Sequence, residues 1–314
     1  MNKLIILTGP TAVGKTELSV KLAEKINGEI ISADSIQVYK YMDIGSAKVT
    51  KEEMRAIPHY LIDVIDPKED FNIAVFKEMA LKAMDEIYKK GKIPIVVGGT
   101  GFYIQSLLYD IDFSESNGEN IEFRKKLEDL AREKGNEAVH EILQSVDEKS
   151  AELIHANNLK RVIRAIEFFE ETGTKISEHN ETQYEKKSPY NFVYFVLNCD
   201  RNVLYERIEK RIDIMLDKGL IDEVKTLKDM GLTKENNSMQ GLGYKEILDY
   251  LDGVISLEEA EYILKRDTRH FAKRQLTWFR REKEVTWINK EDFSFDDDMI
   301  LKYMEDKLKR EGII

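Results

Sequence analysis

The sequence predicts an α/β protein in which helices flank a parallel sheet, with an inserted helical lobe and a helical C-terminal part. Three observations support this prediction. Apolar runs alternate with helical patterns over about residues 1–110, a glycine-rich loop follows the first apolar run, and a charged helical stretch separates two regions that contain strands. Such alternation is typical of parallel sheets covered on both faces.

The glycine-rich loop reads Gly-Pro-Thr-Ala-Val-Gly-Lys-Thr at residues 9–16 and follows the apolar run Leu4–Leu7 directly. Its glycines let the backbone curl so that N–H groups point at an anion, and the following helix presents its positive end there. Strand, loop and helix in this order indicate a P-loop NTPase-like sheet that binds a di- or triphosphate, with Mg²⁺ on the Thr16 hydroxyl. The residues expected to bind the phosphates are Gly9, Thr11, Ala12, Gly14, Lys15 and Thr16.

The elements after the loop continue the alternation. We expect a helix that ends at Asn27-Gly28, a strand over 29–33, a third strand over 59–65, a helix over 73–90 and a buried strand over 93–97. Ligands of such sheets bind beyond the carboxyl ends of the strands. The loop at 9–16, Asp34 and the turn at 98–101 should therefore surround one crevice.

The middle of the chain, residues 114–187, is polar, charged and helical in pattern, without a convincing strand. We expect these residues to form an inserted lobe, and residues 1–113 and 188–314 to form the core. After the lobe we expect a strand over 191–198, helices over about 203–218, 221–230, 244–251 and 257–279, a strand over 284–289, and an acidic, mobile tail.

The composition is that of a globular protein in a reducing compartment. The net charge of −11 argues mildly against a nucleic-acid partner, judged from the average over the surface. Cys199 is the single cysteine, which excludes an internal disulfide and a thiolate-rich zinc site, and the histidines show no metal-ligand spacing. The N-terminus leads directly into strand and loop, and no apolar stretch is long enough to span a membrane. We expect a cytoplasmic protein without a membrane partner.

Asp34 is the acid best placed for chemistry. It ends a strand beside the loop, where a carboxylate could hold Mg²⁺ through water or remove a proton from a nucleophile. The alternative is a helix N-cap. The strand at 93–97 ends in Gly98-Gly99, not in the acid that orients Mg²⁺ in nucleotide-hydrolysing P-loop proteins. This favours group transfer over ATP hydrolysis and leaves small-molecule kinases open.

Two pairs of arginines have helical spacing. Arg161 and Arg164 are three residues apart, and Arg207 and Arg211 are four apart, so each pair lies on one helix face. Either pair could close over phosphates and neutralise a leaving group. The alternative for each is a solvated helix face.

The segment 265–281 is strongly basic within an acidic chain, and aromatic residues are interleaved with its lysines and arginines. This pattern indicates a polyanionic partner such as nucleic acid, unless the aromatic residues belong to the core. The segment 240–246 adds an amide, an aromatic ring and a base, and its alternative is a glycine-rich helix start.

Seven motifs follow one another along nearly the whole chain. They are residues 9–16, Asp-Ser-Ile-Gln-Val-Tyr (34–39), Gly-Ser-Ala-Lys (45–48), Gly-Gly-Thr-Gly-Phe-Tyr (98–103), Arg161 to Arg164 with the following Ala-Ile-Glu, Gln-Gly-Leu-Gly-Tyr-Lys-Glu (240–246), and Thr-Arg-His-Phe-Ala-Lys-Arg-Gln-Leu-Thr-Trp-Phe-Arg (268–280). In this order they resemble the tRNA dimethylallyltransferases of the bacterial type.

The resemblance implies transfer of a dimethylallyl group from dimethylallyl diphosphate to N6 of adenosine 37 beside the tRNA anticodon, with release of diphosphate. By this resemblance Asp34 takes the N6 proton, Thr16 holds Mg²⁺, and Arg211 neutralises the leaving diphosphate with help from Thr11 and Lys15. The residues implied in tRNA binding are Asp34, Ser35, Gln37, Thr100, Arg161, Arg164, Gln240, Gly243, Lys245, Lys273, Arg274, Gln275, Trp278 and Arg280. A monomer is expected.

Two other classes of function stay open at this point. A P-loop kinase for a small metabolite would use the lobe as a lid but leaves the basic aromatic segment unexplained. A nucleotide-switched nucleic-acid-binding module would bind nucleotide tightly without chemistry. Whether ATP also enters the loop is open for all three classes.

Overall fold

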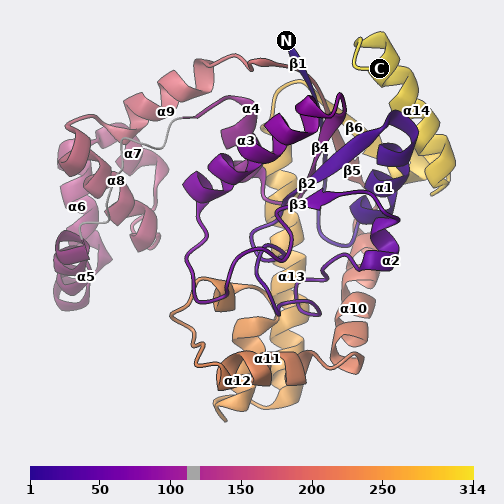
Figure 1. The fold of residues 1–314 in the computed structure, drawn as a ribbon. Helices are drawn as coiled ribbons and strands as arrows, with labels where there is room; N and C mark the ends of the chain where they lie inside the picture. The colour runs from indigo at the N-terminus through magenta and orange to yellow at the C-terminus, as the bar shows by residue number, and fades with distance from the viewer. Residues whose placement is uncertain (112–120) are drawn as a thin grey trace. The chain divides into compact units, whose positions relative to one another are not determined.

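The computed structural model describes residues 1–111 and 121–314 of the chain. Six strands form one parallel sheet in the order β3-β2-β4-β1-β5-β6 (Figure 1). The strands are β1 (Asn2–Thr8), β2 (Gly28–Ala33), β3 (His59–Tyr60), β4 (Ile93–Gly98), β5 (Tyr190–Asn198) and β6 (Val285–Asn289). The sheet confirms the predicted fold class.

The helices α1 (Lys15–Ile26) and α3 (Ile73–Lys89) cover opposite faces of this sheet (Figure 1). Each is amphipathic, and its apolar stripe is buried: Leu18 and Leu22 are fully enclosed in α1, as are Phe76 and Ile87 in α3. The parallel strands are therefore buried on both faces, which explains the continuous apolar runs in the sequence.

The predicted strand over 59–65 is wrong in length, because β3 contains only His59 and Tyr60. The backbone then enters the left-handed region at Leu61 (φ 61°) and Asp63 (φ 59°), which an extended strand cannot accommodate. Beyond β3, an isolated bridge between Tyr39 and Ile65 and neighbouring backbone hydrogen bonds join the chain to residues 37–40.

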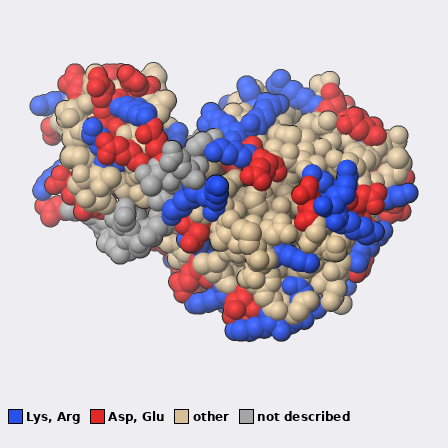
Figure 2. All heavy atoms as spheres, turned by 90° about the horizontal axis from the view of Figure 1, so that it is seen from above, with Lys and Arg blue, Asp and Glu red and all other residues tan. Residues whose placement is uncertain are grey.

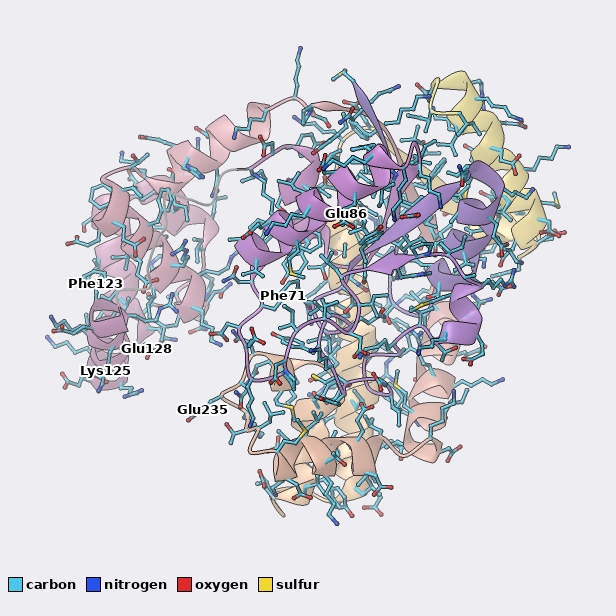
Figure 3. The ribbon with its side chains drawn as sticks, viewed as in Figure 1. Phe71, Glu86, Phe123, Lys125, Glu128 and Glu235 are labelled. Atoms are coloured by element: carbon cyan, nitrogen blue, oxygen red, sulfur yellow. The ribbon has the colours of Figure 1, made fainter. Side chains whose placement is uncertain are left out.

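Helices make up most of the remaining core. Before the lobe they are α2 (Lys51–Met54) and α4 (Gly101–Leu108), and after it α10 (Arg201–Asp217), α11 (Leu220–Asp229), α12 (Tyr244–Leu251), α13 (Leu257–Phe279) and α14 (Asp297–Arg310), with short 3₁₀ turns at Ser238–Gln240 and Lys290–Phe293. The predicted helices after the lobe agree with these within two residues at each end. An aromatic cluster lies near β4, where the Phe71 ring (labelled in Figure 3) meets Tyr39 and Tyr103 edge-on.

The expectation of a mobile C-terminal tail is wrong. Residues 297–310 form α14, whose side chains Leu301 and Met304 are buried while Asp298 and Asp306 are exposed. Asp296 caps the helix by accepting hydrogen bonds from the N–H groups of Asp298 and Met299. An ion pair between Lys25 and Glu305 (2.8 Å) adds to the packing of α14 on α1. The acidic residues of this segment made its apolar stripe hard to recognise in the sequence.

Residues 108–188 form a second compact unit, distinct from the unit of residues 1–107 and 189–314. Its described part contains helices and no strand: α5 (Ile121–Lys134), α6 (Asn136–Val146), α7 (Glu148–Leu153), α8 (Leu159–Thr172) and α9 (Ile176–Glu185). They enclose an apolar core that includes Val139, Leu143 and Val162. The expected lobe boundary at 113/114 lies outside the described residues.

The surface mixes both signs of charge. On the face shown in Figure 2, lysines and arginines are interspersed with aspartates and glutamates, so the net charge of −11 is not a uniform acidic field. Within residues 1–111 and 121–314, no helix combines the length and apolarity that crossing a membrane requires.

Candidate active site

The phosphate-binding loop connects β1 to α1 at the carboxyl end of the sheet. Its curl depends on left-handed backbone at Ala12 (φ 64°) and Gly14 (φ 99°), the second of which suits glycine. At Gly9 a side chain is excluded, because a Cβ there would lie 2.5 Å from the carbonyl oxygen of Leu197 in β5. The sequence therefore places the loop tightly on the sheet, as an anion cradle requires.

Two half-buried cations face this cradle. The Lys15 ammonium donates to the carbonyls of Gly9 and Pro10, both at 2.9 Å, and Arg211 of α10 donates to the Thr11 hydroxyl at 3.4 Å. Burial and, to a smaller extent, the charge of Arg211 lower the pKa of Lys15 to about 7, while Asp34 acts in the opposite direction. Burial also lowers the pKa of Arg211. An anionic ligand would relieve this repulsion between cations.

Asp34 stands at the end of β2 and lines the same cavity as the cradle. One of its carboxylate oxygens, Oδ1, accepts the N–H groups of Ile36 (2.9 Å) and Gln37 (3.2 Å). The helix N-cap alternative is wrong, because a turn and not a helix follows Asp34. The backbone bonds fix the carboxylate where it borders the cavity.

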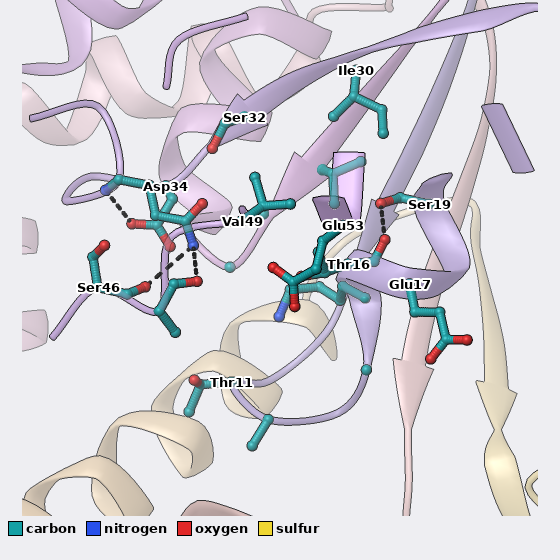
Figure 4. Close-up of a pocket in the computed structure, with 18 of the residues that line it drawn as sticks. Thr11, Thr16, Glu17, Ser19, Ile30, Ser32, Asp34, Ser46, Val49 and Glu53 are labelled. Atoms are coloured by element: carbon teal, nitrogen blue, oxygen red, sulfur yellow. Dashed lines mark hydrogen bonds between the residues drawn. The ribbon is translucent and has the colours of Figure 1, made fainter. Parts of the chain in front are cut away.

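The cavity has a volume of about 500 Å³ and a polar and an apolar part (Figure 4). Thr11, Thr16 and Asp34 border its polar part. The apolar side chains that line it come from α1, β2, β4 and the nearby loops, and they are Val20, Ile30, Val49, Ile62 and Val97. The three segments that we expected around one crevice do converge here, because each follows the carboxyl end of a parallel strand.

Four further lining residues extend the predicted set. Arg207, one helical turn before Arg211, borders the cavity with it, as their spacing suggested, and Phe271 comes from α13. Glu53 of α2 and His59 of β3 also line the cavity, and burial lowers the pKa of His59. No motif in the sequence pointed to Glu53 or His59, since each lies far along the chain from the phosphate loop.

Gln275 connects two glycine turns. Its side-chain oxygen accepts the N–H of Thr11, and its amide nitrogen donates to the carbonyl of Gly99, both at 2.9 Å. The side chain is 6% exposed, so both of its polar ends are used within the protein. α13 thereby holds the phosphate loop against the loop that follows β4. Contact of Gln275 with tRNA stays a prediction.

The opposite side of α13 is basic and open to solvent. A second cavity of about 390 Å³ is lined by His270, Lys273, Arg274, Thr277, Trp278 and Arg281. The Trp278 ring meets Phe102 edge-on at 6.1 Å, and it occupies the space that a side chain at Gly101 would need. Basic groups beside a partly open indole suit a nucleic-acid backbone and base. Arg280 is exposed at the end of α13, outside the residues lining this cavity.

The segment 240–246 forms a glycine-initiated helix start, the alternative that the sequence left open. Gly243 (φ 96°) precedes α12, and Glu246 accepts its N–H. Lys245 pairs with Glu246 at 3.4 Å, and the exposed Gln240 donates to the carbonyl of Lys234. None of these contacts tests the predicted role in tRNA binding.

The remaining predicted residues lie in two places. Ser35 and Thr100 are half-buried beside Asp34 and at the start of α4, and the Thr100 N–H donates to the carbonyl of Ala33. In the second unit, Arg161 of α8 is exposed and Arg164 is half-buried.

The residues present fit Mg²⁺ that is held mainly by a diphosphate and water. Within the described residues, no group of three or more histidine, cysteine, aspartate or glutamate side chains could hold a metal. The Thr16 side chain lies at the cradle with Asp34 and Glu53 along the same cavity. This is the kind of oxygen environment in which Mg²⁺ retains several waters.

A cationic phosphate cradle, a fixed carboxylate and an apolar wall at the carboxyl end of a parallel sheet define a P-loop enzyme of the group-transfer class. The end of β4 supports that class, since it carries Gly98 where hydrolytic relatives place an acid.

Comparisons with known proteins specify the family. A family model described as IPP transferase matches residues 37–282. The tRNA dimethylallyltransferase of Lachnoclostridium phytofermentans is 57% identical over 313 residues, which cover 100% of both chains. The structure of the full-length tRNA isopentenylpyrophosphate transferase of Bacillus halodurans is 44% identical, with a TM-score of 0.74 over 99% of this chain and 98% of that chain. A eukaryotic dimethylallyltransferase acting on tRNA is 31% identical, with a TM-score of 0.78 over 94% of this chain and 75% of that chain. The chain belongs to the IPP transferase family, which confirms the resemblance drawn from the motifs.

Proposed function

We propose that this chain transfers a dimethylallyl group from dimethylallyl diphosphate to N6 of adenosine 37 in tRNA and releases diphosphate. The observation that carries the proposal is the composition of one cavity, which joins a diphosphate cradle, a carboxylate at Asp34 and an apolar wall. A donor with a diphosphate and a five-carbon chain needs the cradle and the apolar wall, and its transfer to an amine needs a carboxylate that accepts the proton. Relatives of full length that are named tRNA dimethylallyltransferases support the same assignment.

The residues of the cavity would divide the reaction between them. The amine N6 attacks C1 of the allylic group as the bond from C1 to the diphosphate oxygen breaks. Asp34 accepts the proton from N6, since an exocyclic adenine amine is a weak nucleophile. Lys15 and Arg211 stabilise the negative charge that collects on the leaving diphosphate, and Arg207 lies beside them. Mg²⁺, held through Thr16, would neutralise further charge on the diphosphate.

The tRNA would bind along the basic side of α13 and present adenosine 37 to the cavity. Flipping that base out of the stack costs a few kcal/mol, which phosphate contacts offset. We assign phosphate and base contacts to Lys273, Arg274 and Trp278, and further phosphate contacts to Arg161 and Arg164. We propose a cytoplasmic monomer, on the grounds of the single cysteine and the charged, mixed surface.

Incubation with an unmodified anticodon stem-loop and labelled dimethylallyl diphosphate tests the proposal. We expect label on adenosine 37 after nucleoside analysis. Asp34→Asn should slow the single-turnover rate by roughly 10²-fold or more while the variant still binds tRNA. Label that stays absent from adenosine, or phosphoryl transfer from ATP to a metabolite in its place, would count against the proposal and favour the kinase alternative.

A further inference from the structure

The turn at residues 43–45 is held by one carboxylate from a distant helix. Glu223, in the first turn of α11, accepts the N–H groups of Asp43 (2.8 Å), Ile44 (2.7 Å) and Gly45 (3.0 Å). It also accepts the Tyr244 hydroxyl at 2.9 Å. Three successive N–H groups that converge on a carboxylate form an anion nest, and charge-assisted bonds of this kind are the strong ones.

The segment 240–246 supplies the other half of this arrangement. The Tyr244 ring is fully buried and lies where a side chain at Gly45 would be, since a Cβ there would approach the ring to 2.7 Å. Gly243 directs the tyrosine there through its left-handed backbone (φ 96°). The glycines at 45 and 243 therefore allow one close contact, between the start of α12 and the turn.

This turn leads directly into a wall of the cavity. Ser46 and Ala47 line the cavity, and their carbonyls accept the side-chain amide of Gln37 at 3.2 and 3.4 Å (Figure 4). Gln37 is in turn fixed through its N–H by Asp34. A continuous series of hydrogen bonds thus runs from Glu223 through the turn and Gln37 to the carboxylate that borders the cavity.

We propose that Glu223, supported by Tyr244, is a positioning residue for prenyl transfer: it fixes the turn at 43–45 and thereby the cavity wall opposite the phosphate cradle. The inference rests on the proposed function. It also gives the segment 240–246 a task inside the protein, through Tyr244, whether or not that segment contacts tRNA.

The test separates positioning from general loss of structure. We expect Glu223→Ala to lower the single-turnover rate of transfer by about 10- to 100-fold, because small misplacements of reacting groups cost this much. The amides of residues 43–45 should exchange faster with deuterium. Affinity for an unreactive thiodiphosphate analogue of the donor should change less than about twofold, since the hydrogen bonds of Glu223 go to the turn at 43–45 and to Tyr244, outside the phosphate loop. Tyr244→Phe removes one of four bonds and should have a smaller effect on both rate and exchange.

Asp222→Ala is the matched control, because Asp222 is the exposed neighbour of Glu223 on the same helix turn. Faster amide exchange in Glu223→Ala with an unchanged transfer rate would overturn the inference, as would equal losses of rate and analogue affinity. An effect of Tyr244→Phe as large as that of Glu223→Ala would contradict the assignment to the carboxylate. Should the unaltered chain transfer no prenyl group, the proposed function itself fails, a result distinct from any of these.

Discussion

At the scale of single residues, the cations that border the cavity outnumber the acids by one. Lys15, Arg55, Arg207 and Arg211 border it, against Glu17, Asp34 and Glu53. The ammonium of Lys15 donates to carbonyls of its own loop, and burial lowers its pKa. Binding of an anion and protonation of Lys15 must therefore be coupled.

The coupling predicts that affinity for the donor falls as pH rises. With a pKa of about 7 in the free protein, Lys15 is largely neutral above that pH, whereas an adjacent diphosphate raises its pKa. Binding of the thiodiphosphate analogue at about pH 8.5 should then take up close to one proton, and affinity should decrease from about pH 7 to pH 9. Calorimetry in two buffers of different ionisation enthalpy measures the uptake. Equal uptake in Lys15→Met would show that another group is responsible.

The bridging amide of Gln275 predicts a large effect on stability from one polar side chain. Gln275→Ala leaves the N–H of Thr11 and the carbonyl of Gly99 without their bonds, which should lower the free energy of unfolding by about 1–3 kcal/mol. Urea denaturation measures the change. Gln144→Ala, an exposed glutamine of α6, should stay within about 0.5 kcal/mol of the unaltered chain. Equal effects would mean that the bridge contributes nothing to stability.

The sequence predicted those site residues whose role can be recognised from adjacent residues in the chain. Lys15, Thr16 and Asp34 follow strands directly, so a short motif locates them at the cavity. Glu223 gave no such signal, because its task depends on a turn that is 178 residues away from it in the chain. In the sequence, a carboxylate in the first turn of a helix looks like an ordinary capping residue. Only the fold shows that Glu223 binds the N–H groups of residues 43–45.

At the scale of elements, the pattern of apolar residues predicted the helices that have a wide apolar stripe and the strands that form a continuous apolar run. It was wrong for β3, where left-handed residues end an apolar run, and for α14, where acidic residues obscured the stripe. In both cases the deciding interaction is tertiary: a bridge to Tyr39 for the first, and packing on α1 for the second. The short α2 and the helix α4 were not predicted, since α2 has only four residues and α4 is mostly apolar, so that neither shows a helical period.

A pair of methionines tests whether α14 is part of the core. Met304 is fully buried, whereas Met299 on the same helix is 52% exposed. Met304→Ala should lower the free energy of unfolding by about 2–5 kcal/mol, and Met299→Ala by less than about 0.5 kcal/mol. Chemical denaturation of both variants gives the comparison. If the two values agree, the segment is as loosely attached as its composition suggested.

At the scale of the whole molecule, the chain is acidic, yet it presents basic groups on two separately folded units. The apolar core of residues 108–188 is its own, and the basic groove of α13 belongs to the other unit. The net charge therefore could not exclude a nucleic-acid partner, because affinity for a polyanion depends on local charge. The order of the seven motifs predicted the family, whereas the average charge argued against a nucleic-acid partner.

If both units bind tRNA, Arg161 in the second unit should contribute one phosphate contact. Arg161→Ala should then weaken tRNA binding without changing which sequence is preferred, and it should lower the slope of log affinity against log salt by about 0.7–0.9. Filter binding at several salt concentrations measures the slope. Arg132→Ala is the control, since Arg132 is an exposed arginine of the same unit that is already paired with Asp129. A slope unchanged by Arg161→Ala, or equally reduced by both variants, would remove Arg161 from the specific contacts with tRNA. The lobe would then act on the reaction without holding the substrate's backbone through Arg161.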